Sequence, residues 1–272
     1  MPELPEVECV RRALLPLVGE RIGTAQLRRE DIVEHLPGRG GAAALLEDDT
    51  VRGLFRHGKQ LAIEGESGRV VCVQLGMSGQ LLLTAGGVPA FTHAHAVWVF
   101  RRGLTLTFRD PRRFGGLSLY PPLAALRERR WSSLGPDALT HPDRALADAC
   151  RASGRRIKDL LLDQSALAGV GNIYADESLF EARIRPSRRA RSLRPPEVLA
   201  LSEAVRGILA RAVEAGGTTL RDYVRPDGAP GGAGSLHRAY GRHGQPCDRC
   251  GTLLRRTVLS QRTTSYCPRC QR

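Results

Sequence analysis

The chain has 272 residues, and its 41 lysine and arginine residues outnumber its 28 aspartate and glutamate residues, giving a formal net charge of +13. This excess of positive charge indicates a polyanionic partner and favours nucleic acid over an acidic small molecule. No signal-peptide core, no apolar run of about 18 residues and no basic amphipathic helix with a bulky apolar face is evident. We therefore expect a cytoplasmic, non-membrane protein, long enough for two or three domains.

The chain begins with the run Met1-Pro2-Glu3-Leu4-Pro5-Glu6. If Met1 is removed, Pro2 provides a secondary amine beside Glu3. An α-amino group titrates near pH 7.7–8.0, so a useful fraction of it is neutral and nucleophilic at physiological pH. Apolar residues at helical spacing, from Val7 to Leu17, predict a helix behind this start. An ordinary helix start rich in proline and glutamate is the alternative interpretation.

Residues 20–118 contain short β-favouring runs that predict a sandwich or barrel, with the first helix packed against it. Residues 97–100 and 104–108 are expected to form one hairpin.

Two loops carry side chains that could insert into duplex DNA. Met77 lies in a glycine-rich turn, and Phe114 follows Arg112 on a loop. Apolar wedges beside arginine unstack base steps in DNA-bending proteins, whereas the alternative is that both residues cover the edge of the sandwich.

Residues 119–134 resemble a linker, with charge and proline but little apolar periodicity, and residues 135–226 have a helical pattern. Gly169 and Gly171 precede a helix expected at residues 173–182. Free N–H groups there, with the Asn172 side chain, favour a phosphate site over a plain turn between core helices. The glycine-rich residues 216–234 could be a lid or a disordered linker.

The last segment, 227–272, contains Cys247-x2-Cys250 and Cys267-x2-Cys270, a spacing that predicts a closed, structural four-cysteine zinc site. Between the pairs we expect a hairpin with Arg262 near its tip, where a solvated charge is the alternative role.

Cys9, Cys72 and Cys150 are expected to be buried hydrophobes rather than disulfide partners. The chain has only two lysines, Lys59 and Lys158, which makes both candidates for specific roles.

Taken together and in this order, the motifs resemble the formamidopyrimidine-DNA glycosylase family over essentially the whole chain. They are the opening PELPEVE, residues 75–79, 110–115, 169–175, 216–220 and 240–242, and the four-cysteine finger. The resemblance implies an α+β multidomain protein: an N-terminal β-sandwich domain with flanking helices (1–118), a linker (119–134), a helix–two-turn–helix domain (135–226), and a glycine-rich loop with a zinc finger (227–272). One departure is Gln74, which stands where the family commonly has histidine.

The resemblance also implies a base-excision repair enzyme that removes 8-oxoguanine and formamidopyrimidines from duplex DNA and then cleaves the strand by β,δ-elimination. Pro2 would form a Schiff base with the sugar C1′, and Glu3 would be the acid. Lys59 and Arg262 would assist the eliminations at phosphate. The gap left by the extruded nucleotide would be filled by Met77, Arg112 and Phe114, and the DNA backbone would be held by His93, Lys158 and Asn172.

Two other functions are weighed against this one. A sister enzyme of the endonuclease VIII type would act on oxidised pyrimidines, but Leu4 and the full set of wedge residues favour the purine enzyme. A non-catalytic zinc-finger protein could recognise bent or damaged DNA, but it would have no need of Pro2 beside Glu3. We expect one structural zinc ion, a monomer, and association with the nucleoid through DNA.

Overall fold

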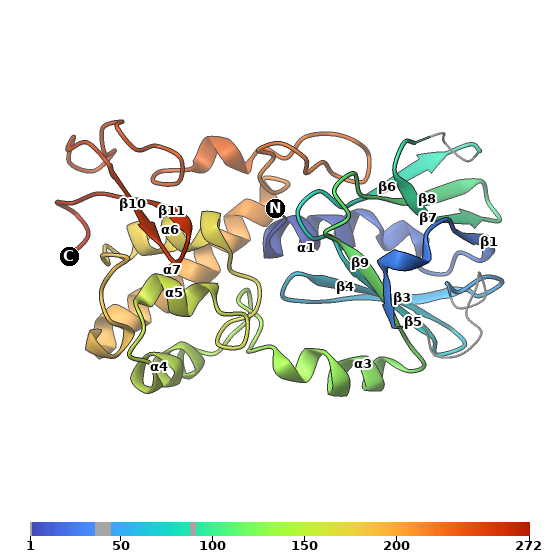
Figure 1. The fold of residues 1–272 in the computed structure, drawn as a ribbon, viewed down its shortest axis with the longest axis horizontal. Helices are drawn as coiled ribbons and strands as arrows, with labels where there is room; N and C mark the ends of the chain where they lie inside the picture. Colours follow the sequence, from blue (N-terminus) through green and yellow to red (C-terminus); the bar gives the residue numbers. More distant parts are fainter. Residues whose placement is uncertain (1, 36–44, 88–90) are drawn as a thin grey trace. The chain divides into compact units, whose positions relative to one another are not determined.

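The computed structural model describes residues 2–35, 45–87 and 91–272, shown in Figure 1. They form two compact units, one made of residues 1–133 and 215–232 and the other of residues 134–214 and 233–272. Each unit is described by itself below.

The first unit is the predicted β-sandwich. One sheet has the strand order β1-β7-β8-β6 and the other has the order β2-β9-β5-β4-β3. The strands are β1 (Ile22–Leu27), β2 (Val33–His35), β3 (Val51–His57), β4 (Gln60–Gly65), β5 (Val70–Gln74), β6 (Gln80–Ala85), β7 (Ala94–Phe100), β8 (Leu104–Arg109) and β9 (Gly116–Tyr120). Neighbours are antiparallel except β2 and β9. The hairpin expected at residues 97–108 is β7–β8.

The core of this unit draws on both sheets and on the first helix. Trp98 and Phe108 come from one sheet and Val71 from the other, and all three are at most 1% exposed. Helix α1 (Leu4–Ala13) adds Val7 and Val10, followed by the short 3-10 helix η1 (Leu15–Leu17). A second 3-10 helix, η2, spans Glu30–Ile32. The helical spacing in the sequence therefore predicted the face of α1 that packs on the sandwich.

The face of α1 near its start also buries a carboxylate. Glu8 is 5% exposed and accepts hydrogen bonds from Arg11, Arg12 and Arg56 at 2.8–3.0 Å. Burial alone raises the pKa of Glu8, but the three guanidinium groups outweigh it and lower the pKa from 4.5 to about 2. A carboxyl group whose pKa is lower in the folded state than in the unfolded state stabilises the fold. That stabilisation is fully present at pH values above the pKa of the group in the unfolded chain.

Replacing Glu8 by glutamine is therefore expected to lower the free energy of unfolding at pH 7 by about 1–2 kcal/mol, since solvent screens part of the attraction to the three arginines. The difference from the unaltered protein should shrink as the pH falls from 4.5 towards about 2, because Glu8 itself then takes up a proton. Chemical denaturation at several pH values measures this. Glu20→Gln is the control, since Glu20 pairs with the highly exposed Arg102 and such pairs are worth about 0–1 kcal/mol. A difference that stays constant with pH would contradict the expectation.

Residues 119–134 were predicted to be a linker, but they are largely helical. Helix α3 (Leu123–Arg129) and the 3-10 helix η3 (Trp131–Ser133) fill most of this stretch, and Leu126 and Trp131 are buried. The Arg130 guanidinium donates hydrogen bonds to Gln60 and Gln74 on the five-stranded sheet. The helix is too short to show apolar periodicity, so packing and these hydrogen bonds decide its place.

Residues 215–232 belong with the sandwich, although the sequence analysis divided this stretch at residue 226. Hydrogen bonds explain the difference: the Thr218 N–H donates to Glu6 Oε1 at 2.8 Å, and the Leu83 N–H donates to the Pro226 carbonyl at 2.8 Å. The stretch is neither an unsupported linker nor part of the helical unit. The predicted division into domains otherwise stays a prediction.

The second unit combines helices with the finger. Its helices are α4 (Asp143–Ala152), α5 (Ile157–Leu162), α6 (Asn172–Glu181) and α7 (Pro195–Glu214), with 3-10 helices η4 (Ala190–Ser192) and η5 (Ala233–Leu236). The predicted helix at residues 173–182 is α6. A hairpin of β10 (Arg255–Leu259) and β11 (Arg262–Tyr266) follows. Among the described residues, no helix is long and apolar enough to cross a membrane.

The three scattered cysteines are buried, as predicted. Burial raises the pKa of the Cys9 and Cys150 thiols to about 11 and that of Cys72 to about 12. A thiol with so high a pKa is unreactive at neutral pH.

Candidate active site and DNA-binding residues

Pro2 and Glu3 lie at the N-terminal end of α1, and both are buried. Glu3 is the N-cap residue, and its N–H donates to Glu6 Oε2 at 2.7 Å within a reciprocal capping box. The other oxygen of Glu6 accepts the Thr218 N–H at 2.8 Å. Glu6 was not singled out in the sequence analysis, but this carboxylate connects the backbone of the candidate acid to residues 215–232.

The two candidate wedge loops interlock within the first unit. Asp110 is fully buried, and one of its oxygens accepts the Ser78 hydroxyl at 2.5 Å while the other accepts the Gly115 N–H at 2.7 Å. Gly76 has φ +61°, and a Cβ there would lie 2.3 Å from the carbonyl of Phe114. The two backbones thus approach too closely for any residue but glycine.

The loops present the side chains that the sequence singled out. Phe114 is 55% exposed, Arg112 is exposed, and Met77 is half-buried. The Arg112 guanidinium lies 4.8 Å from the centre of the Phe114 ring. An aromatic ring this exposed contributes little to the sandwich core, and whether it covers the sheet edge or serves as a wedge is tested below.

Phe114→Ala is expected to leave the melting temperature nearly unchanged and to weaken binding of a lesion-containing duplex by roughly 10–100-fold, because an aromatic ring that stacks on a base contributes about 1–3 kcal/mol. Phe108→Ala is the matched control: Phe108 is fully buried, and its loss should cost about 3–5 kcal/mol of stability. Thermal unfolding and fluorescence anisotropy measure the two effects. A large fall in melting temperature for Phe114→Ala would identify the ring as structural.

Two further predicted residues of this unit lie on turns. Lys59 is half-buried between β3 and β4, directly after Gly58, which has φ +55°. His93 is exposed before β7 and has φ +62°. The carbonyl of His93 accepts the Asp110 N–H at 3.1 Å, which joins it to the wedge loops.

In the second unit, the predicted residues gather around the β10–β11 hairpin. Arg262 begins β11 and is exposed, after a turn in which Ser260 and Gln261 have φ of 44° and 59°. The Asn172 amide, at the start of α6, donates to the Thr263 carbonyl at 3.0 Å. Lys158 differs from expectation: it is fully buried, and its ammonium donates to Asp176 Oδ1 at 2.6 Å. In this arrangement it presents no charge to a phosphate.

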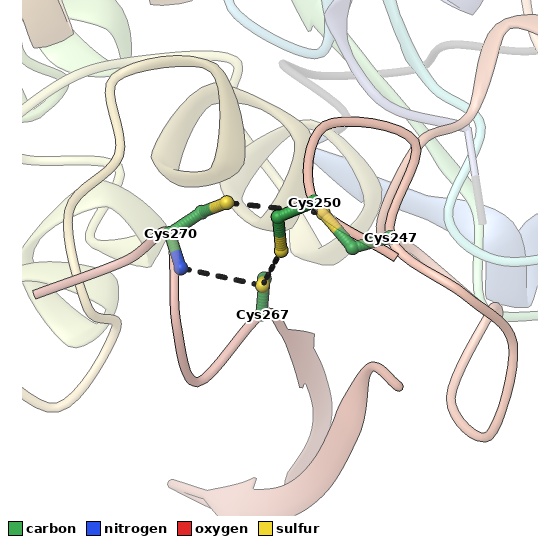
Figure 2. A group of neighbouring side chains, drawn as sticks. All are labelled: Cys247, Cys250, Cys267 and Cys270. Carbon is green, nitrogen blue, oxygen red and sulfur yellow. Dashed lines mark hydrogen bonds between the residues drawn. The ribbon is translucent and has the colours of Figure 1, made fainter. Parts of the chain in front are cut away.

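The four predicted cysteine ligands lie together in Figure 2, with all Sγ atoms within 4.8 Å of one another. The Cys250 and Cys267 sulfurs are 3.6 Å apart and those of Cys247 and Cys270 are 4.0 Å apart. Ligands about 2.3 Å from a tetrahedral zinc ion are separated by about 3.8 Å, whereas a disulfide requires about 2.05 Å. The geometry therefore fits one structural zinc ion, which completes a small core where, among the described residues, Phe180, Ala239 and Leu254 pack with the cysteines.

Comparison with known proteins identifies three segments of the chain. The formamidopyrimidine-DNA glycosylase N-terminal domain matches residues 1–117, the H2TH domain of the same glycosylase matches residues 134–224, and the zinc finger found in FPG and IleRS matches residues 244–272. The protein is therefore a multidomain DNA glycosylase with a zinc finger. The chain belongs to the formamidopyrimidine-DNA glycosylase family.

Individual relatives extend over the full length. Formamidopyrimidine-DNA glycosylase of Geobacillus kaustophilus is 41% identical over 275 residues, with 100% of both chains covered. The MutM (FPG) protein from Thermus thermophilus is 40% identical in sequence. Its crystal structure matches this one with a TM-score of 0.87, covering 99% of this chain and 98% of that chain. A Lactococcus lactis FPG mutant in complex with Fapy-dG containing DNA is 30% identical, with a TM-score of 0.90 and 100% of both chains covered.

Proposed function

We propose that this protein excises oxidised purines, 8-oxoguanine and formamidopyrimidines, from duplex DNA and then cleaves the strand by β,δ-elimination. The observation that carries the proposal is the full-length match to formamidopyrimidine-DNA glycosylases, one of them 41% identical over 275 residues, in a chain where Pro2 and Glu3 directly follow Met1. Similar structures hold DNA containing Fapy-dG or carbocyclic 8-oxo-G. We assign the same substrate class to this chain.

The proposed chemistry begins at the secondary amine of Pro2. Its nitrogen attacks the sugar C1′, the bond from C1′ to the base breaks, and the proton lost from the nitrogen goes to the departing base. Glu3 protonates the ring oxygen O4′ as the C1′–O4′ bond opens, which assists loss of the base and leaves a Schiff base between Pro2 and C1′. The resulting Schiff base makes the C2′ proton acidic. Loss of that proton expels the 3′ phosphate, and a second elimination expels the 5′ phosphate. We assign Lys59 to the first elimination and Arg262 to the second, because each can neutralise a departing phosphate.

The remaining residues of the site are assigned to the DNA itself. Met77, Arg112 and Phe114 fill the gap left by the extruded nucleotide, supported by the exposure of Phe114 and its contact with Arg112. His93 and Asn172 contact the backbone. The second unit as a whole, with its finger, is assigned to DNA binding, and the net charge of +13 supports a polyanionic partner. We propose that the protein works as a monomer in the cytoplasm, associated with the nucleoid.

Borohydride trapping on a duplex with a single 8-oxoguanine tests the proposal. A covalent protein–DNA adduct is expected, and its cross-linked peptide should begin at Pro2. An adduct at Lys59 or Lys158 would overturn the assignment of the nucleophile. A matched duplex containing an oxidised pyrimidine tests the sister activity, since preferential trapping there would favour an enzyme of the endonuclease VIII type. Binding of lesion DNA without any adduct would favour a non-catalytic DNA-binding protein.

A further inference from the structure

A buried ion pair lies beneath the hairpin that carries Arg262. Lys158 on α5 is fully buried and Asp176 on α6 is 1% exposed, with 2.6 Å between Nζ and Oδ1. The ammonium also donates to Thr264 Oγ1 at 2.8 Å and to the Thr263 carbonyl at 3.3 Å. An ammonium has three protons, so these three acceptors are enough to engage them all.

Asp176 completes the connection to the same strand. Its second oxygen, Oδ2, accepts the backbone N–H of Ser265 at 2.9 Å. Burial raises the pKa of Asp176 to about 6 although Lys158 acts in the opposite direction, so the carboxylate is ionised at neutral pH. The pair therefore contacts three consecutive residues of β11, and the first of them directly follows Arg262.

Two more contacts hold the hairpin close to Arg262, one at Ser260 before it in the sequence and one at Thr263 directly after it. The Ser260 hydroxyl donates to Asp159 Oδ1 at 2.7 Å, and the Asn172 amide donates to the Thr263 carbonyl at 3.0 Å. The turn between them contains two non-glycine residues with positive φ, Ser260 and Gln261, a conformation that the surrounding contacts must maintain. Arg262 itself stays exposed.

We propose that Lys158 and Asp176 form a hairpin clamp: they are positioning residues that set the orientation of Arg262 through residues 263–265, and Lys158 does not itself contact DNA. The inference rests on the proposed function, in which Arg262 assists the second elimination. A buried ion pair adds little net stability over apolar residues of similar size, but it demands one geometry. A guanidinium that must meet a departing phosphate benefits from such a fixed support.

The experiment uses the full-length, zinc-loaded protein and a duplex with a single 8-oxoguanine. One variant, Lys158→Met with Asp176→Leu, removes both charges at similar volume. A second and milder one, Thr264→Val, removes one hydroxyl from the clamp. Both are also made in an Arg262→Ala background. A gel that resolves β from β,δ products gives the product ratio, borohydride trapping gives the Schiff base yield, and anisotropy gives the salt dependence of binding.

The clamp predicts a fall in the ratio of β,δ to β product of at least about fivefold for the double variant and about twofold for Thr264→Val, with trapping yield and zinc content retained. In the Arg262→Ala background neither change should lower the ratio further, since residues that act through Arg262 are not additive with it. The slope of log affinity against log salt should be unchanged, whereas loss of a direct phosphate contact lowers it by about one.

Three results with the clamp variants would overturn the proposal: an unchanged ratio in folded variants, a further fall in the Arg262→Ala background, or a reduced salt slope. If the double variant does not fold, Thr264→Val decides between the same outcomes. If Arg262→Ala alone keeps the wild-type ratio of β,δ to β product, Arg262 does not assist the second elimination. The clamp then has nothing to position, although base excision itself is unaffected. Failure of the proposed function looks different, because the unaltered protein would then give no trapped adduct at all.

Discussion

Replacing Glu3 by glutamine is expected to lower excision of 8-oxoguanine by about 100- to 10,000-fold, the range that a positioned general acid contributes. The same variant should still cleave DNA at a preformed abasic site, because the base has already left and the amine of Pro2, the proposed nucleophile, is unaltered. Glutamine also matches glutamate in size, and the Glu3 N–H that donates to Glu6 is unaffected. The start of α1 should therefore stay intact.

Single-turnover assays on the two substrates separate these effects. Glu20→Gln is a suitable control, since it makes the same chemical change at a carboxylate that pairs with the exposed Arg102. It should leave both rates unchanged. Equal loss on both substrates would show that Glu3 acts in strand cleavage or in folding, and unchanged excision would place the acid elsewhere in the chain.

Replacing Cys267 by serine is expected to release the zinc ion and reduce DNA binding by at least about 100-fold. Structural zinc contributes about 10–16 kcal/mol of apparent binding energy in finger peptides, and this energy is folding energy. The apolar core of the finger is small, because Leu254, Ala239 and Phe180 are the buried apolar residues that pack with the cysteines. Without the metal, the finger loses the folding energy that the four thiolates supply, and the end of β11 that leads to Cys267 loses its anchor.

Cys150→Ser is the matched control in the same unit, since Cys150 is buried but outside the four-cysteine group. It should keep a full complement of zinc. Metal analysis and anisotropy with lesion DNA measure both variants. Freshly purified Cys267→Ser protein that still binds one zinc ion, or that binds DNA normally without it, would contradict the structural role.

The sequence predicted most reliably those structural features that depend on the spacing of nearby residues. The cysteine pairs, the hairpin at residues 97–108, and the apolar face of α1 each carry their signal within a few residues. Helix α4 was not predicted as a separate element, and α3 was mistaken for a linker, because short helices are stabilised mainly by packing.

Contacts between distant residues could not be predicted in the same way. Lys158 meets a carboxylate 18 residues away and a hydroxyl 106 residues away, so neither its burial nor its partners can be inferred from spacing. Glu6 reaches Thr218 across 212 residues. The rarity of lysine did mark Lys158 as unusual, but only the fold shows that it faces inward.

The single carboxylate of Asp110 has a consequence for how this protein can change over evolutionary time. It joins the turn at residues 76–79 to the loop at residues 110–116 through Ser78 and Gly115, while Gly76 allows the two backbones to touch. An insertion or a bulkier residue in either loop would displace the other. The two loops should therefore be inherited as a pair, and homologues that lack an acid at position 110 should also differ at positions 76, 78 and 115.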